Sequence, residues 1–327
     1  MSVAAMNMVQ SINLALREEM ERDPSVVCLG EDVGVDGGVF RVTEGLFEKF
    51  GKERMIDTPL AESSIVGTAI GMAMNGMRPV AEIQFLGFIY PAYQQLVSHA
   101  ARMRNRTRGR VTLPMVVRAP YGAGVKALEH HSESTEAVFC HIPGLKVVVP
   151  STPLEAKGLL TASIRDPDPV LFLEPTRSYR LLKEEVPEGE YVLPLGKARK
   201  LREGKDVTIV GWGAMMPIIR KAVESLEKDG ISPEVLDLRT LAPMDFASII
   251  DSVKRTGRCV VVHEAPRTCG LGAEISARIM EKALLSLQAP VERVTAPDIT
   301  VPLPKGEHYY YISPERVVKG VKRTMSF

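Results

Sequence analysis

The chain has 327 residues, of which 45% are hydrophobic and 25% are charged, as is ordinary for a soluble globular protein. Its 41 basic and 40 acidic residues leave a formal net charge of +1, so no global field attracts nucleic acid or an anionic membrane, and we expect neither as a partner. The length favours two domains, each able to bury a core without disulfide bonds.

Short apolar runs alternate with longer amphipathic segments through the first half of the chain. The runs predicted as strands are Val26–Leu29, Val80–Phe85, Met115–Arg118, Lys146–Val149 and Val170–Leu173. The segments predicted as helices are Ser63–Asn75, Tyr90–Arg104 and Pro153–Ile164. Because the strands are almost wholly apolar, as strands buried on both faces must be, they predict a parallel sheet covered by helices.

A segment rich in proline, glycine and charge, Lys183–Gly204, interrupts this alternation and is interpreted as a linker. Beyond it, the predicted strands are Val207–Val210, Val235–Leu238, Cys259–Val262 and Val291–Val294. The predicted helices between them are Ala214–Lys228, Asp245–Arg255 and Ala273–Leu287. The fold class is therefore α/β with two doubly wound domains, residues 1–185 and the smaller 205–327, joined by a linker at 186–204.

The four cysteines, Cys28, Cys140, Cys259 and Cys269, include no CxxC pair, so neither zinc nor dithiol redox chemistry is indicated. The N-terminal segment lacks the basic and apolar regions of a signal peptide. The most apolar window, Ile65–Met77, is too short to span a bilayer. We therefore expect a cytoplasmic protein.

Phosphate-binding motifs are incomplete or missing in the sequence. Gly211 and Gly213 follow a predicted strand and open a predicted helix, but Met216 stands where the dinucleotide fingerprint needs a third glycine. No Walker A loop, HExxH pair or GxSxG elbow is present. The sequence therefore shows no phosphate-binding element of its own.

Three polar side chains stand in surroundings that suggest a role, and each also has a structural explanation. Glu62 precedes an apolar helix, where it either complements the helix dipole or serves a site. Gln84 lies within a predicted strand as either a satisfied core amide or a site residue. His131, next to His130, is either part of a solvated loop or a catalyst.

Several motifs in a fixed order carry a resemblance to one family. They are GEDVG at 30–34, GGVF at 37–40, DTPLAE at 57–62, AEIQF at 81–85, HS at 131–132, PGLKVVVP at 143–150 and HEAP at 263–266. Over essentially the whole chain, they resemble the beta subunit of the thiamine-diphosphate-dependent decarboxylating component of 2-oxo acid dehydrogenase complexes. The order of the motifs makes the resemblance more specific than any single one.

The resemblance implies a transketolase-like fold whose N-terminal domain grips the aminopyrimidine end of thiamine diphosphate. It also implies a heterotetramer of two alpha and two beta subunits, with a beta–beta contact and the cofactor at the alpha–beta interface. In this family the alpha subunit binds the diphosphate and its magnesium through a Gly-Asp-Gly…Asn motif. This sequence contains no Gly-Asp-Gly, which agrees with the missing phosphate motifs.

Five site residues follow from the same resemblance. Glu62 matches the glutamate that hydrogen-bonds a ring nitrogen of the aminopyrimidine and favours its imino tautomer. Leu60, Gln84 and Phe88 match the lining of the pyrimidine pocket, and Phe88 leaves the substrate class open. His131 matches the active-site histidine that orients the substrate carboxylate or the incoming lipoyl group.

A monovalent cation site is also implied. Relatives hold potassium with main-chain carbonyls in a stretch that matches Ser163, Ile164, Asp166 and Asp168. Many of them have asparagine where Asp168 stands, and an Asp-Pro turn between a helix and a strand explains the segment equally well.

We therefore predict a subunit that, with its alpha partner, decarboxylates a small 2-oxo acid on thiamine diphosphate, either pyruvate or a branched-chain acid. The acyl group then passes to a lipoyl group on the acyltransferase core. Two alternatives stay open. One is another transketolase-like enzyme, such as acetoin dehydrogenase or half of a split transketolase, and the other is a non-catalytic scaffold that binds the acyltransferase core.

Overall fold

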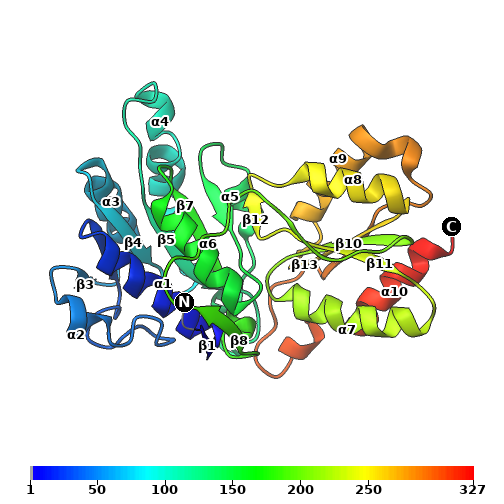
Figure 1. Ribbon diagram of the computed structural model, residues 1–327, viewed down its shortest axis with the longest axis horizontal. Helices are drawn as coiled ribbons and strands as arrows, with labels where there is room; N and C mark the ends of the chain where they lie inside the picture. Colours follow the sequence, from blue (N-terminus) through cyan, green and yellow to red (C-terminus); the bar gives the residue numbers. More distant parts are fainter. Residues whose placement is uncertain (1–2) are drawn as a thin grey trace.

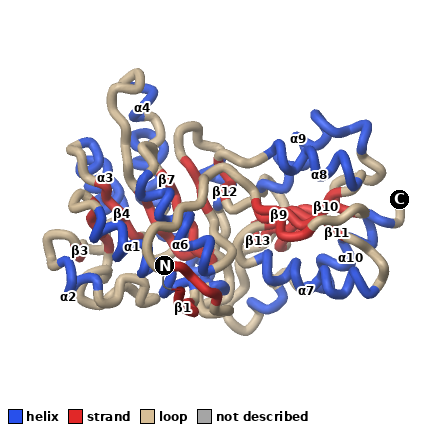
Figure 2. Tube along the Cα trace, in the orientation of Figure 1, coloured by secondary structure: helices blue, strands red, loops and turns tan. Residues whose placement is uncertain are grey.

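The computed structural model describes residues 3–327, and over this range the strands form three sheets. The largest has seven strands in the order β12-β6-β7-β5-β4-β2-β3, and the second has five in the order β14-β13-β10-β11-β9. A small third sheet pairs β1 with β8. Figures 1 and 2 show the two larger sheets at opposite ends of the long axis, each with helices packed around it. The predicted α/β class is confirmed.

The N-terminal sheet is parallel except at one edge. Its parallel strands are β2 (Val26–Gly30), β3 (Met55–Asp57), β4 (Arg78–Glu82), β5 (Val116–Tyr121), β6 (Lys146–Val148) and β7 (Val170–Pro175). β12 (Thr240–Ala242) joins β6 in the antiparallel direction. A strand from the C-terminal part of the chain therefore completes this sheet.

Six α-helices belong to the N-terminal part of the chain. They are α1 (Met8–Arg22), α2 (Leu46–Phe50), α3 (Glu62–Met74), α4 (Met103–Arg106), α5 (Glu136–Cys140) and α6 (Pro153–Arg165). The short 3-10 segments are η1 (Leu86–Phe88), η2 (Tyr90–Ala92), η4 (Glu129–His131) and η5 (Thr176–Ser178), and η3 (Gln95–Ala100) is a π-helix. Helix α6 begins with a proline, and the Thr152 side chain accepts a hydrogen bond from the Glu155 amide.

Two predicted elements differ from the structure. The predicted helix Tyr90–Arg104 is wrong as one helix, because it is broken into η2, η3 and α4, and Pro91 in η2 has no amide to donate. The predicted strand Val80–Phe85 ends at Glu82. Beyond it, the Phe85 ring packs against the rings of Phe88 and His131. Gln84 therefore lies in a loop after β4 and not within the strand.

The C-terminal sheet is built from β10 (Val207–Gly211), β11 (Pro233–Asp237), β13 (Cys259–Pro266) and β14 (Glu292–Ala296), which run parallel, and β9 (Arg199–Arg202), which is antiparallel to β11. Its helices are α7 (Met215–Lys228), α8 (Phe246–Thr256), α9 (Leu271–Ala283) and α10 (Pro314–Met325), with 3-10 segments η6 (Leu284–Ser286) and η7 (Glu307–Tyr309). Helix α8 is capped by Asp245 at its start and ends at Gly257, whose φ is 72°.

The segment interpreted as a linker, 183–204, contains two strands. β8 (Glu184–Pro187) pairs with β1 (Val3–Met6), and β9 forms an edge of the C-terminal sheet. Neither strand was predicted, because its charged side chains form no apolar run in the sequence. An edge strand pairs through its backbone and can turn its side chains to water. The segment is therefore not free of secondary structure, and the linker and the domain boundaries stay a prediction.

Buried carboxyl groups lie where the two halves of the chain meet. Glu136 and Glu264 are buried, and burial raises the pKa of each to about 7. A guanidinium nitrogen of Arg177 lies 3.9 Å from Glu264, and the Gly124 amide donates to the buried Glu307 at 2.5 Å. This contact region thus contains more acidic side chains than basic side chains that could compensate them.

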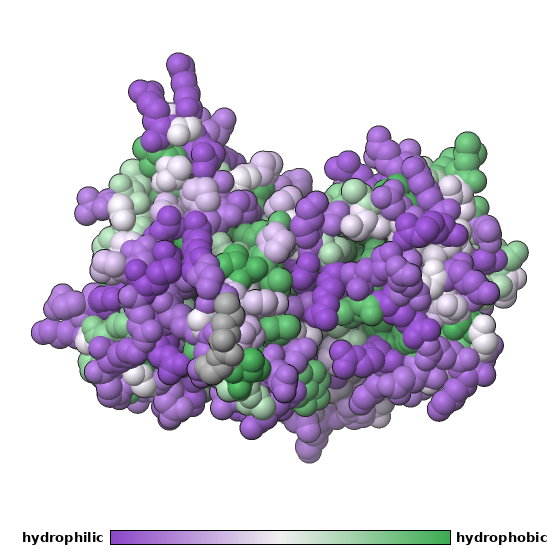
Figure 3. Space-filling view, in the orientation of Figure 1, coloured by the Kyte–Doolittle hydropathy of each residue, from purple (hydrophilic) through white to green (hydrophobic). Residues whose placement is uncertain are grey.

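The face in view in Figure 3 is largely hydrophilic, with its hydrophobic residues in small separate areas. Among residues 3–327, no helix combines the length and the apolar character that a membrane crossing needs.

Candidate active site

The predicted site residues follow three strands at the carboxyl edge of the N-terminal sheet. Leu60 and Glu62 come after β3, Gln84 and Phe88 come after β4, and His131 comes after β5. In space, the order of these strands is β5-β4-β2-β3. In open α/β sheets, ligands bind outside the carboxyl ends of the strands, so the topology brings these residues to the expected edge.

Other acidic residues lie near Glu62, which is the first residue of α3. Burial, and then the charges of Asp32 and Glu62, raises the pKa of the Glu31 carboxyl group. Gln84 donates its side-chain amide to the Asp32 carboxylate at 3.2 Å. Glu62 and Gln84 are therefore linked through the loop after β2, which places Glu31 and Asp32 between them.

A second group joins His131 to aromatic rings. The His131 ring lies 4.7 Å from Phe85, 5.0 Å from Phe88 and 4.6 Å from His130, measured between ring centroids. Burial, and then the charge of His130, lowers the pKa of His131, so its imidazole is neutral at neutral pH. Its Nδ1 atom is buried and has no hydrogen-bond partner among the described residues.

The loops that carry these rings approach each other closely. A Cβ atom at Gly87 would lie 1.9 Å from the carbonyl oxygen of His130. Only glycine fits there, so η1 and η4 can touch, and Phe88 reaches both histidines.

The outer side of the site is open to solvent. Leu60 is 71% exposed, and the buried hydroxyl of Thr58 has no partner among the described residues. On helix α3, a Cβ at Gly71 would meet nothing within 4 Å, and at Gly67 its nearest neighbour would be Gln95 at 3.9 Å. Gly71 therefore makes no tight contact within this chain.

A buried ion-pair network fixes the strands beneath the site. Arg118 on β5 lies 2.7 Å from Glu82 on β4 and 2.6 Å from Glu174 on β7. The Tyr179 hydroxyl donates to Glu174 at 2.5 Å. Burial raises the pKa of Glu82, and the Arg118 charge opposes that rise. The network thereby ties together the strands that precede Gln84 and His131.

The predicted cation ligands lie in the last turn of α6 and in the loop after it, but basic side chains already bind there. Arg78 donates to the carbonyl oxygens of Ile164 and Asp166, at 2.8 and 3.4 Å. Lys146 lies 2.6 Å from both carboxylate oxygens of Asp166, and Arg104 pairs with Asp168 at 2.6 Å, while the Ser163 carbonyl accepts from the Asp166 amide. A potassium ion here would have to share these oxygens. Over residues 3–327, no three or more His, Cys, Asp or Glu side chains form a metal-binding group.

Glu31, Asp32, Phe85 and His130 were not predicted as site residues from the sequence. The first two lie in the GEDVG motif after β2, and their position at a strand's carboxyl end was a usable signal. The contacts of Phe85 and His130 depend on how η1 meets η4, which the sequence alone does not reveal.

Comparisons with known proteins cover the whole chain. Residues 4–181 match the transketolase pyrimidine-binding domain, and residues 196–317 match the transketolase C-terminal domain. The chain is 53% identical over 321 residues to the pyruvate dehydrogenase E1 component subunit beta of Acholeplasma laidlawii, covering 98% of each protein. It is 50% identical over 327 residues to the 2-oxoisovalerate dehydrogenase subunit beta of Bacillus subtilis strain 168, covering 99% of this chain and 100% of the relative.

A solved structure named as a split-gene transketolase, in an inactive beta4 tetramer, superimposes with a TM-score of 0.81. The two chains are 23% identical, and the match covers 99% of each. At this identity, the likeness shows the fold alone.

Proposed function

Because the chain belongs to the beta subunits of the E1 component of 2-oxo acid dehydrogenase complexes, we propose that it supplies half of a thiamine diphosphate site, which an alpha subunit completes. The observation that carries the proposal is the gathering of Glu62, Gln84 and His131 at one carboxyl edge of the sheet, on a side that this chain leaves open.

The residues present fit the aminopyrimidine end of the cofactor. Leu60 and Phe88 offer apolar walls, and the Thr58 hydroxyl and His131 Nδ1 are buried polar atoms without a partner among residues 3–327. Glu62 would hold a ring nitrogen of the aminopyrimidine by sharing a proton with it, and its carboxylate would thereby favour the imino tautomer. Thiamine diphosphate itself supplies the carbon nucleophile for a 2-oxo acid.

His131 and Gln84 position the reacting groups. Since His131 is neutral, it can accept a proton at neutral pH, and it would orient either the 2-oxo acid carboxylate or the incoming lipoyl group. Gln84 is held by Asp32, and its side chain would line the pyrimidine end of the site.

The proposed assembly is cytoplasmic and contains two alpha and two beta subunits. The alpha subunit holds the diphosphate and the magnesium ion, and the acyltransferase core supplies the lipoyl group. The uncovered face of α3 around Gly71 suits a contact with an alpha subunit or a second beta subunit. A potassium ion at residues 163–168 is a separate proposal, which a potassium titration of activity and melting temperature tests.

The proposed substrate is pyruvate or a branched-chain 2-oxo acid, and relatives named for both lie at about the same identity. The test is a substrate panel on the chain reconstituted with its alpha subunit, magnesium and thiamine diphosphate, with lipoyl acylation as the readout. Acylation that depends on one of these acids supports the proposal. Acylation driven by acetoin, ketose transfer without acylation, or assembly without any turnover would support the alternative functions instead.

A further inference from the structure

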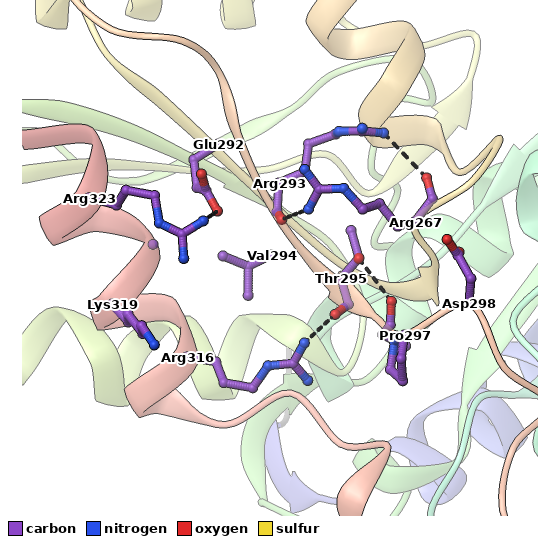
Figure 4. A pocket seen from close by; sticks show the side chains of 12 residues that line it. Arg267, Glu292, Arg293, Val294, Thr295, Pro297, Asp298, Arg316, Lys319 and Arg323 are labelled. Atoms are coloured by element: carbon purple, nitrogen blue, oxygen red, sulfur yellow. Dashed lines mark hydrogen bonds and ion pairs between the residues drawn. The ribbon is translucent and has the colours of Figure 1, made fainter. Parts of the chain in front are cut away.

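A basic pocket lies at the free edge of the C-terminal sheet, far from the candidate active site. Its cavity of about 500 Å³ is enclosed by β14, the loop after β13 and helix α10 (Figure 4). Five basic side chains line it, and they are Arg267, Arg293, Arg316, Lys319 and Arg323. The acidic residues in the lining are Glu292 and Asp298. The pocket therefore concentrates an excess of three positive charges in a chain whose net charge is +1.

Main-chain carbonyl groups hold three of the arginines in place. Arg316 donates to the Tyr311 carbonyl at 3.2 Å and the Thr295 carbonyl at 2.5 Å. Arg267 and Arg293 each donate to the carbonyl of the other, at 2.9 and 3.3 Å. A carbonyl fixes the orientation of a guanidinium but leaves its full charge and its remaining N–H groups available.

The acids of the pocket leave most of its cations without an ion pair. Glu292 pairs with Arg323 at 3.1 Å, and Asp298 accepts the amide and hydroxyl of Thr268, both at 2.8 Å. The Thr268 hydrogen bonds, and then contacts with Arg267, lower the pKa of Asp298, so Arg267 is partly compensated. Among residues 3–327, Arg293 and Arg316 bind main-chain carbonyls and no carboxylate, and Lys319 has neither a hydrogen bond nor an ion pair. Fixed cations without a carboxylate partner around a cavity are the arrangement that an anion needs.

From this geometry we propose that the pocket binds a small organic polyphosphate of nucleotide size. Guanidinium groups match phosphate oxygens in pairs, and the three cations without a carboxylate partner, Arg293, Arg316 and Lys319, suit a ligand with several negative charges. The volume falls within the range of about 300–1,000 Å³ that small-molecule sites occupy. Position agrees as well, because Arg267 follows the carboxyl end of β13, which runs parallel to β14.

The test is calorimetric titration of ATP, pyrophosphate and inorganic phosphate into the alpha–beta complex, already saturated with thiamine diphosphate and magnesium. We expect one ATP site per beta chain, with pyrophosphate weaker and phosphate weakest. Lys319→Gln should weaken ATP binding about tenfold, as loss of one charge-assisted contact does. Since Lys319 has no partner among the described residues, this variant should fold normally, and Arg267→Gln should act in the same direction.

The matched control is Arg106→Gln, which removes the same charge from α4, at the other end of the molecule in Figure 1, and should leave ATP affinity unchanged. The proposal is overturned if ATP does not bind the saturated complex at millimolar concentration. It is also overturned if Lys319→Gln and Arg267→Gln bind ATP as the parent does, or if a short oligoglutamate peptide binds this pocket more tightly than ATP.

Discussion

The candidate active site and the basic pocket carry opposite charges. The active site gathers Glu31, Asp32 and Glu62 beyond the carboxyl ends of β2 and β3, whereas the pocket gathers Arg267 after β13, Arg293 on β14 and Arg316 on α10. The acidic residues follow the ends of parallel strands, and the basic ones lie between an edge strand and a helix. The fold thus locates the two sites, and the side chains decide which chemistry each one can serve.

Arginine side chains in the two regions also differ in their hydrogen-bond partners. Arg118 is buried and neutralised by two carboxylates, so it stabilises the sheet and has no charge left for a ligand. Among residues 3–327, Arg316 binds only carbonyl oxygens, so it keeps its charge. An arginine's hydrogen-bond partners therefore separate a structural role from a ligand-binding one.

The largest expected effect is at the acidic edge. Glu62→Gln should lower decarboxylation in the assembled complex by about 100- to 10,000-fold, because an amide cannot share a proton with the pyrimidine as a carboxylate does. The measurement is steady-state turnover with an artificial electron acceptor, beside a melting curve that should not change. Glu48→Gln in the first turn of α2 is the matched control. Near-normal turnover of Glu62→Gln would remove Glu62 from the site.

The next effect concerns the neutralised arginine. Arg118→Met should lower the free energy of unfolding by about 3–5 kcal/mol, because it leaves Glu82 and Glu174 buried without their partner. Urea denaturation measures the loss. The triple variant with Glu82→Gln and Glu174→Gln should recover part of it. A loss under about 1 kcal/mol would mean that the network is not an ion pair in the folded protein.

His131→Ala should reduce substrate turnover or lipoyl acylation about 100-fold while leaving thiamine diphosphate affinity nearly unchanged. The reason is that His131 lies with Phe85 and Phe88 and not among the acids around Glu62. Separate assays with an artificial acceptor and with a lipoyl domain show which step is lost. His130→Ala is the companion variant, and by removing a nearby positive charge it should raise the pKa of His131 in the pH profile. Full activity of His131→Ala in both assays would make this histidine a bystander.

A further expected effect is a pH dependence of stability from the acids between the two halves. In the folded protein, burial raises the pKa of Glu136 and Glu264 to about 7, whereas an unfolded carboxyl group titrates near 4.5. The native state therefore binds more protons between these values, and stability falls as the pH rises from about 4.5 to 7.

Glu136→Gln should flatten that fall, which melting temperatures across this range measure. The other titratable and charged groups that face Glu136 and Glu264 are unchanged in this variant, and they are Arg177, Glu307, Tyr121 and Tyr310. Equal slopes for the variant and the parent would show that Glu136 is already ionised at pH 5.

Much of the fold was predictable because buried parallel strands appear as apolar runs. The helix predicted at Ser63–Asn75 is confirmed within one residue at each end, and its first residue is Glu62. Helix α1 was not predicted, although Asn7 and Gln10 form a capping box that marks its start. The sequence alone had no means of finding the break of Tyr90–Arg104 into three kinds of helix, because local propensity does not specify it.

The candidate active site and the basic pocket also differ in how much of each was predictable from the sequence. Glu62, Gln84 and His131 stood out because ordered motifs carried a family resemblance. The link from Glu62 through Glu31 and Asp32 to Gln84 needed the pairing of β2 with both β3 and β4. The basic pocket was hidden completely, because its cations are spread along the C-terminal third of a chain with balanced charge. Both features depend on contacts between segments far apart in the chain, which could not be predicted from the sequence.

The central claim is that this chain provides only the pyrimidine half of a cofactor site, and calorimetric titration of thiamine diphosphate with magnesium tests it most directly. The isolated chain should bind the cofactor weakly and show no turnover, because the charged contacts to a diphosphate are the stronger ones and the proposed assembly assigns them to the alpha subunit. Adding the alpha subunit should restore tight binding and activity together. Tight, magnesium-dependent binding by the isolated chain would contradict the account.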